Sequence, residues 1–522
     1  MSEEVPKPSA PPGTVERFLE VASEFQLGEL VTEQPHPATA NLSSLAGEDV
    51  GAAVQVLKGV DLEALERLVG YATDLDPLAS TMAEALHAER RIFLGGCGAT
   101  GRLSISLEWF GRNGWLGKAT GEQLVGFMAG GDAALVRSIE RFEDYPEYGV
   151  RQLRELGFSD RDLMVGITEG GETPFVIGAT EEAAQRSALQ PFFLYCNPDE
   201  VLRRVAERSK RVLESDAIRK INLTVGPMGI TGSTRMQAST VQMAAVGWAL
   251  ANRESPDGIE AMAAEFRNWV EETDFSFLVP FIELEVQLYD EGEFVLYEPG
   301  EFGLTVLTDT TERSPTFSLP PFENVGRPED TAASCYLHVE ADSSAEAWRS
   351  LLGREPRTLS WGGLEHLTGE RNLLGFDFSD SGAARRTKLG KHTVFSVANR
   401  RDAIALQFGE LCHEIPANGR DAFSRHLLLK LVLNTHSTLV MGRRGRFEGN
   451  VMTFVNATNR KLIDRAIRYI RMLLSRQHGL RPEYEEVARV LFDVRSELGP
   501  DEPIVMKTVE RMVAGRRSAR GE

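Results

Sequence analysis

The pattern of apolar and polar positions changes character near residue 90. From residue 15 to residue 90, apolar side chains recur at helical spacing, which predicts helices. Beyond that point, short apolar runs end in glycine or a polar residue and are followed by helix-length segments. Such alternation indicates βαβ units and a mainly parallel sheet. We expect its strands at residues 91–98, 124–131, 163–166, 192–197 and 221–226.

A second series of the same rhythm follows. Its strands are expected at residues 294–297, 335–339, 373–378, 393–397 and 403–408. The predicted fold class is therefore α/β, with two three-layer α/β/α domains and mainly parallel sheets. In chain order, we expect a disordered lead (1–14) and the N-terminal helices with the first domain (15–255). A helical bridge (256–290), the second domain (291–422) and a C-terminal helical segment (423–515) follow. The tail beyond residue 515 is expected to be disordered.

Composition and charge narrow the function classes. The chain has 522 residues, which is too long for one core, and a net charge of −20. An acidic chain repels nucleic acid and anionic membranes, so we expect neither as a partner, and an anionic ligand needs a local positive site. The opening residues do not form a secretory signal, and the apolar stretch at 427–441 is too short to span a bilayer.

The cysteines and histidines point to no metal site. The four cysteines are far apart and form no CxxC pair, which argues against a disulfide framework or a zinc site and fits a reducing, cytoplasmic setting. The nine histidines are scattered along the chain. We therefore expect neither a metal nor a cofactor.

The sharpest local feature is the segment GGCGATGR at residues 95–102, where a strand runs into a glycine-rich turn that opens a helix. Backbone N–H groups at such a turn favour an anion. Gly98 and Gly101 allow close approach, Thr100 offers a hydroxyl, and Arg102 is either a charge partner or a structural clasp. The same pattern is also compatible with a nucleotide loop or a simple tight turn, but the glycine spacing lacks the full dinucleotide fingerprint.

Two more polar turns follow strands of the same domain, GITEGGETP at 166–174 and TGSTR at 231–235. Ligands of open α/β sheets bind at the carboxyl ends of the strands, so three such turns predict one pocket. Hydroxyls and backbone amides suit a phosphate monoester. The candidate binding residues are Gly98, Ala99, Thr100, Gly101, Arg102, Thr168, Gly170, Gly171, Thr173, Ser233, Thr234 and Arg235.

These motifs resemble the N-acetylmuramic acid 6-phosphate etherases and the related glucokinase regulatory proteins, which are built from sugar-isomerase-type (SIS) domains. The resemblance is carried by TEQPHPAT (32–39), GCGATGR, AGGDAAL (129–135), ERFED (140–144), GETPFVIG (171–178), CNP (196–198), GPMGITGSTRMQAST (226–240), LKLVLNTHST (429–438) and NATNRKLIDRA (456–466). It implies a sugar phosphate as the small-molecule ligand.

The order of the motifs implies a fused pseudo-dimer. In the etherases the GSTR helix runs directly into the LKLVLN helix, whereas here the second α/β series stands between them, as in the regulatory protein. At the place of the phosphate loop, the second domain has EPGEFG at 298–303, whose Glu298 and Glu301 would repel a phosphate.

The resemblance also implies a pair of catalytic carboxylates. ERFED resembles the segment with one catalytic glutamate, which falls on Glu143, and DTTERSPTF at 309–317 resembles the segment with the other, which falls on Glu312. In the first domain the place equivalent to Glu312 is Phe110, and the nearby Glu108 is expected to face elsewhere. The two halves would thus complete one site at their interface. Ether cleavage by elimination needs a base and an acid, which we assign to Glu143 and Glu312.

Some positions depart from the etherase pattern. Gly170 stands where a serine is expected, Glu172 where an arginine is expected, and Gln237 where a basic residue is expected, while Glu169 adds a further carboxylate. Three functions remain open: a carbon–oxygen lyase acting on N-acetylmuramic acid 6-phosphate or a related amino-sugar phosphate, a non-catalytic sugar-phosphate sensor that docks onto a kinase or another partner, and an aldose–ketose isomerase. Further self-association of the pseudo-dimer also remains open.

Overall fold

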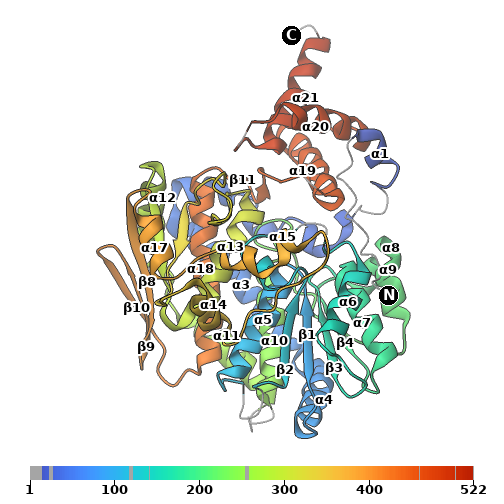
Figure 1. Ribbon diagram of the computed structural model, residues 1–522. Coiled ribbons are helices and arrows are strands. Elements are labelled where there is room, and N and C mark those ends of the chain that lie inside the picture. Colours follow the sequence, from blue (N-terminus) through green and yellow to red (C-terminus); the bar gives the residue numbers. More distant parts are fainter. Residues whose placement is uncertain are drawn as a thin grey trace.

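Two five-stranded sheets lie side by side in the computed structural model, with a group of C-terminal helices standing above them (Figure 1). The structure describes residues 14–22, 27–116, 121–139, 142–252, 258–457, 459–499 and 501–520. Nearly all of the expected N-terminal lead lies outside these residues. The predicted α/β class is confirmed.

The first sheet is parallel throughout and has the order β2-β1-β3-β4-β5. Its strands are β1 (Ile92–Gly96), β2 (Leu124–Met128), β3 (Leu163–Ile167), β4 (Phe192–Tyr195) and β5 (Arg219–Asn222). Strands β1 to β4 are buried along their whole length, which explains why they read as continuous apolar runs. All five predicted strands of this sheet are present, but the last, expected at residues 221–226, lies at Arg219–Asn222.

Helices cover both faces of this sheet. On one face lie α4 (Asp76–His87), α5 (Ala99–Arg112) and α10 (Gln237–Ala251), whose buried residues join one core with Leu94 and Val165. On the other face lie α6 (Pro146–Glu155), α7 (Pro174–Arg186) and the pair α8 (Asp199–Val205) and α9 (Glu207–Glu214), around Phe93 and Met164. The right-handed crossovers of parallel strands require this two-sided cover.

The second sheet is mixed, with the order β10-β9-β8-β6-β7. β6 (Phe294–Glu298) pairs in parallel with β7 (Cys335–Leu337) and β8 (His392–Asn399), whereas β8, β9 (Ala403–Phe408) and β10 (Leu411–Pro416) form an antiparallel meander. The expectation of a mainly parallel sheet is wrong for this half, because the β8–β9 and β9–β10 connections are too short for a crossover. Strand β10 lies at the sheet edge.

The strand expected at residues 373–378 is also wrong. Leu373 lies in α16 (Glu370–Leu374), and the following residues form a loop. Phe376 and Phe378 are fully buried in that loop, and Phe378 packs against Tyr336 and Trp348. A short apolar run therefore reflects core burial here and not strand pairing. The other helices of this half are α13 (Gly303–Phe317), α14 (Ser344–Leu352), α15 (Glu365–Thr368) and α17 (Asp380–Thr387).

One long helix, α18 (Ala422–Arg443), runs through the middle of the molecule. It packs against α2 (Leu42–Glu48), α3 (Val50–Gly70), α10, α12 (Leu278–Asp290) and α13, so it joins the N-terminal helices to both halves. The bridge consists of α11 (Gly258–Glu272) and α12. Nearly every residue of α18 is buried, including polar ones such as Lys430 and Asn434, which must therefore find partners inside the protein.

The C-terminal helices form a separate lobe above the sheets (Figure 1). It follows the short hairpin β11 (Phe447–Glu448) and β12 (Val451–Met452) and comprises α19 (Arg460–His478), α20 (Tyr484–Glu497) and α21 (Ile504–Arg520), with α1 (Val15–Leu19) packed beside α20. Helix α21 continues to Arg520, so the tail expected to be disordered from residue 515 is helical to that point. Among the described residues, no helix is long and apolar enough to cross a membrane.

Candidate active site

A cavity of about 910 Å³ lies over the carboxyl ends of the first sheet. Residues from both α/β halves and from the C-terminal lobe line it. Ten of the candidate residues are among them: Gly98, Ala99, Arg102, Glu143, Gly170, Thr173, Ser233, Thr234, Arg235 and Glu312. The other four, Thr100, Gly101, Thr168 and Gly171, lie behind this lining.

The first turn, between β1 and α5, is shaped by close backbone contacts. Gly98 has a φ of +55°, and a Cβ on Gly101 would lie 2.4 Å from the Cβ of Met128. The Thr100 hydroxyl donates to the Cys97 carbonyl and accepts from the Cys97 N–H. Thr100 and Gly101 therefore hold the turn, and Gly98 and Ala99 present its surface to the cavity at the N-terminus of α5.

The second turn is held in the same manner. The hydroxyls of Thr168 and Thr173 lie 3.0 Å apart, and Thr168 also accepts from the N–H of Gly171. Thr173 precedes the first residue of α7 and faces the cavity together with Gly170. Gly170 therefore offers no hydroxyl where a serine was expected, and a Cβ at this position would lie 3.3 Å from the Glu172 Cγ.

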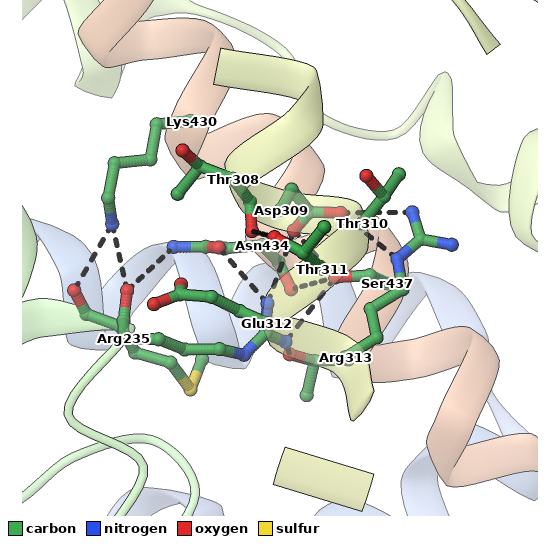
Figure 2. A network of polar contacts seen from close by, with 12 residues as sticks. Arg235, Thr308, Asp309, Thr310, Thr311, Glu312, Arg313, Lys430, Asn434 and Ser437 are labelled. Atoms are coloured by element: carbon green, nitrogen blue, oxygen red, sulfur yellow. Dashed lines mark hydrogen bonds and ion pairs between the residues drawn. The ribbon is translucent and has the colours of Figure 1, made fainter. Parts of the chain in front are cut away.

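In the third turn, some side chains face the cavity, while the guanidinium of Arg235 lies in the protein interior. Ser233 and Thr234 line the cavity, and the buried hydroxyl of Ser233 makes no hydrogen bond with any described residue. The guanidinium of Arg235 points toward α13 and α18, where it donates to Asp309, Asn434 and Ser437 (Figure 2). It also donates to the Thr438 hydroxyl. Ser233 is the group of this turn that a ligand oxygen can satisfy.

Arg102 also acts as a clasp. Its guanidinium donates to the carbonyls of Ala134 and Leu135, and it lies 4.0 Å from the carboxyl of Glu312. The side chain is 3% exposed. The two alternatives for Arg102 are both realised, because it anchors the loop after β2 and places a positive charge beside Glu312.

Glu312 is presented by α13 from the second half of the chain. Its carboxyl is buried, and burial raises the pKa of Glu312, while the positive charges of Arg102, Arg235 and Lys430 act in the opposite direction. A buried carboxyl with a raised pKa favours its protonated form, as a general acid requires.

Glu143 lies across the cavity on the loop before α6 and is half-buried. The thiol of Cys97 donates to its carboxylate over 3.7 Å. Glu140 and Arg141, at the start of the ERFED motif, lie outside the described residues. The structure thus brings Glu143 and Glu312, which are far apart in the sequence, to the wall of one cavity.

The two unexpected carboxylates carry less free charge than the sequence suggests. Glu172 pairs with Lys461 at 2.7 Å and with Arg208 at 2.5 Å, and these cations, opposing burial, lower the pKa of Glu172 to about 2. Burial, reinforced by Glu312 and Glu143, raises the pKa of Glu169 to about 8. At neutral pH Glu172 is thus neutralised by its partners and Glu169 is mostly protonated.

The C-terminal lobe supplies cations that sequence reasoning missed. Lys461 and Arg465 of α19 line the cavity, and Arg465 and Arg468 bind the buried carboxylate of Glu33. The motif NATNRKLIDRA contains Lys461 and Arg465, and TEQPHPAT contains Glu33. Both motifs were identified in the sequence as part of the family resemblance. Their positions along the chain did not indicate that Glu33 would contact Arg465 and Arg468.

Other predicted features lie elsewhere. Glu298 contacts His338, and Glu301 accepts from Asn399, so the EPGEFG segment does not line the cavity. Glu108 does face away from the cavity, toward Arg354 and Arg357 of the second half. Among the described residues, no group of three His, Cys, Asp or Glu side chains is arranged to hold a metal ion.

Comparison with known proteins gives a consistent result. The family model of the glucokinase regulatory protein N-terminal SIS domain matches residues 77–184. The chain is 32% identical over 223 residues to the N-acetylmuramic acid 6-phosphate etherase of Klebsiella aerogenes. This match covers 42% of this chain and 67% of that protein. It is 35% identical over 222 residues to the etherase of Rippkaea orientalis, which covers 41% of this chain and 64% of that protein.

Solved structures include more distant matches. A putative phosphosugar isomerase from Silicibacter pomeroyi matches with a TM-score of 0.42 and 12% identity, over 76% of this chain and 99% of that chain. The tagatose-6-phosphate ketose/aldose isomerase from Escherichia coli matches with a TM-score of 0.41 and 12% identity, over 80% of this chain and 97% of that chain.

Proposed function

The chain belongs to the family of N-acetylmuramic acid 6-phosphate etherases, and from this membership we propose that it is a carbon–oxygen lyase. Its substrate is N-acetylmuramic acid 6-phosphate or a related amino-sugar phosphate. The observation that carries the proposal is that Glu143, from the first half, and Glu312, from the second, line one cavity together with the three polar turns.

The phosphate is assigned to the polar turns. The N-termini of α5 and α7 face this region, and each provides the positive end of a helix dipole. In α7, Pro174 has no N–H and the N–H of Phe175 donates to the Glu143 carbonyl, so the backbone donors are assigned to the first turn of α5. The Ser233 hydroxyl, which no described residue satisfies, donates to a phosphate oxygen. Lys461 adds a positive charge from the C-terminal lobe.

The reaction uses the two carboxyls in separate roles. Glu143 removes the proton at C2 of the open-chain sugar, and Glu312 gives its proton to the ether oxygen as the bond to C3 breaks and lactate leaves. Water then adds at C3 of the unsaturated aldehyde, with its proton returning to Glu312. Glu143, which is only half-buried, exchanges its proton with solvent between the two steps, and C2 then regains a proton from Glu143. The balance is one water consumed and one lactate released.

The two α/β halves act as an internal pseudo-dimer in this account. The first half provides the phosphate turns and Glu143, and the second provides Glu312 in place of the buried Phe110 of the first. One composite site results from one chain.

A sensor is the second candidate function, and the match of residues 77–184 to the regulatory-protein SIS domain supports it. In this alternative the same cavity binds the sugar phosphate without turnover and the complex docks on a kinase. Ligand binding would then raise the melting temperature with no product formed.

The proposal is tested with an assay for lactate released from N-acetylmuramic acid 6-phosphate. Glu143→Gln and Glu312→Gln should each lower kcat about 10²- to 10⁴-fold, the usual contribution of a general acid or base. Glu301→Gln, which alters a glutamate outside the cavity, is the matched control and should retain activity. Absence of lactate with the wild type, while the sugar phosphate still raises its melting temperature, would favour the sensor.

A further inference from the structure

A second, much smaller cavity lies directly behind Glu312. Its volume is about 20 Å³, and it is enclosed by α5, α10, α13 and α18. Ala99 and Glu312 line both cavities, so the two are separated only by these residues. A space of this size holds one water molecule if polar groups surround it.

The walls of the small cavity are polar. They include the side chains of Thr308, Asp309, Lys430 and Asn434 besides Glu312. The buried hydroxyl of Thr308 makes no hydrogen bond with any described residue. A water molecule here can bond to that hydroxyl and to the carboxyl of Glu312, which gives it the two or more partners that a buried water needs.

Lys430 is held at this cavity by the first turn of α10 and by the two residues that precede this helix. Its ammonium donates to the Arg235 carbonyl at 2.9 Å and to the Thr240 hydroxyl at 2.7 Å, with a weaker contact to the Met236 carbonyl. None of these acceptors is charged. Among the described residues, no direct ion pair joins Lys430 to Glu312, and both side chains reach the same region beside Arg235 (Figure 2).

Charged groups from four helices surround Glu312 and Lys430 and act on their pKa values. Glu312 is faced by Arg102 of α5, Arg235 before α10, Asp309 of its own helix and Lys430 of α18. Lys430 is faced by Glu312, Asp309 and Arg235 and, from α3, by Asp61. Burial lowers the pKa of Lys430 to about 8 and raises the pKa of Asp61 to about 7.

Arg102 and Arg235 are each engaged by other acceptors. Arg102 is bound to two carbonyls, and Arg235 pairs with Asp309 at 3.2 Å. The ammonium of Lys430, like the guanidinium of Arg102, has neutral acceptors only. Of the three cations that face Glu312, Lys430 is the one that lines the small cavity.

We propose that Lys430 is a positioning residue for the reaction: its ammonium, through one water molecule in the small cavity, stabilises the carboxylate that Glu312 becomes when it protonates the departing lactate oxygen. This inference rests on the proposed lyase function and adds to it a residue that does not touch the substrate. A fixed charge in the low-dielectric interior of a protein stabilises a developing opposite charge far more than it would in bulk water.

The proton balance is unchanged by Lys430. Glu312 loses its proton to lactate in the first step and recovers one from the attacking water in the second. Lys430 keeps its protons throughout and only lowers the free energy of the intermediate state in which Glu312 is ionised.

The kinetic test uses Lys430→Met. We expect kcat to fall about 10- to 100-fold with KM changed less than twofold, because the ammonium acts on the transition state and not on substrate binding. In the Glu312→Gln background, Lys430→Met should leave kcat almost unchanged, since the Glu312 carboxylate that Lys430 stabilises is no longer formed. Lys391→Met, which removes an exposed lysine far from the cavity, is the control. An equal fall in kcat on replacing Lys430 in the wild type and in Glu312→Gln would overturn the proposal.

A second readout does not depend on turnover. The infrared absorption of the protonated Glu312 carboxyl, isolated as the difference between wild type and Glu312→Gln, is titrated with pH in the presence and absence of the Lys430 charge. Removing a nearby positive charge must raise the titration midpoint of Glu312 in Lys430→Met, and Lys430→Arg should leave it near the wild-type value. Lys430→Gln, which keeps a donor toward the same carbonyls, replaces the Met variant if that one does not fold.

The two arms separate failure of this inference from failure of the lyase function. If the wild type releases no lactate but the titration midpoint of Glu312 is still higher in Lys430→Met than in the wild type, only the lyase function is contradicted. An active wild type whose Glu312 midpoint is the same with and without Lys430 contradicts the role of Lys430.

Discussion

Two glutamates of the second turn determine how the site can hold a phosphate. Glu172 is kept ionised and neutralised by Lys461 and Arg208, so its charge is cancelled within hydrogen-bonding distance. Glu169 forms no such ion pair with any residue that the structure describes. It remains neutral below the pH at which it titrates, since burial raises the pKa of Glu169 to about 8. A sequence that places two acidic residues beside a phosphate therefore stays compatible with binding an anion at neutral pH.

This difference predicts a pH dependence of binding. As the pH rises through about 8, Glu169 loses its proton and adds a negative charge to the phosphate site. We expect the Kd for the sugar phosphate to rise as the pH passes through that value, as measured by calorimetric titration from pH 7 to pH 9. The second pKa of a phosphate monoester is about 6, so the ligand is already doubly charged over this range.

In Glu169→Gln the rise centred near pH 8 should disappear, because the amide cannot ionise. Glu200→Gln, an acidic residue outside the cavity, serves as the control and should preserve the wild-type profile. A pH dependence that survives in Glu169→Gln would assign the titration to another group.

At the scale of elements, the turn between β1 and α5 depends on the contact of that helix with β2. A Cβ on Gly101 would lie 2.4 Å from the Met128 Cβ, and a Cβ on Gly96 would lie 2.3 Å from the Thr100 carbonyl carbon. These glycines let α5 pack against the sheet, and this packing aims the N-terminus of the helix at the cavity.

Gly101→Ala should therefore lower the free energy of unfolding by about 1–3 kcal/mol, the usual cost of overpacking. The measurement is chemical denaturation followed by circular dichroism. Gly59→Ala is the matched control: it lies inside α3 with open space around its Cα, so alanine should stabilise the protein by up to about 1 kcal/mol. Equal stability of wild type and Gly101→Ala would show that the helix is not fixed by this contact.

The sequence predicted the first sheet well because β1 to β4 are short, apolar and each followed by a helix, whereas β5 has the mostly polar sequence RKIN and begins earlier than expected. The second sheet was predicted less well, since β10 alternates exposed and buried residues at an edge and the run at 373–378 is buried without pairing. The turns that carry Gly98, Thr173 and Ser233 were found from their local pattern. Lys461, Glu33 and Lys430 were not, because their contacts join segments distant in the sequence, and no local pattern encodes them.

At the scale of the whole molecule, a buried charge cluster joins the two α/β halves. Arg354, from the second half, pairs with Asp132 at 2.6 Å and with Glu108 at 3.0 Å, and Arg357 pairs with Glu108 at 2.7 Å. Arg357 also donates its backbone N–H to Asp132. Because Asp132 follows β2 and Glu108 lies on α5, the cluster fixes the second half against the elements that shape the cavity.

Arg354→Met should destabilise the protein by about 3 kcal/mol, because it leaves buried carboxylates with one cation too few. It should also lower lactate release, since the distance between Glu143 and Glu312 depends on how the halves are held. The control is Arg349→Met, which breaks an exposed pair with Glu355 and should change stability by less than about 1 kcal/mol. Unchanged unfolding of Arg354→Met would mean that the halves are held together elsewhere.

The central claim is that one composite site, built from both halves, eliminates lactate by removing the proton at C2. The most direct measurement is a single incubation of the wild type with N-acetylmuramic acid 6-phosphate in D₂O, with lactate and the sugar product analysed by mass spectrometry and NMR. The account predicts stoichiometric lactate and a product that carries deuterium at C2. Lactate released without deuterium at C2 would contradict the elimination, and no lactate at all would contradict the lyase.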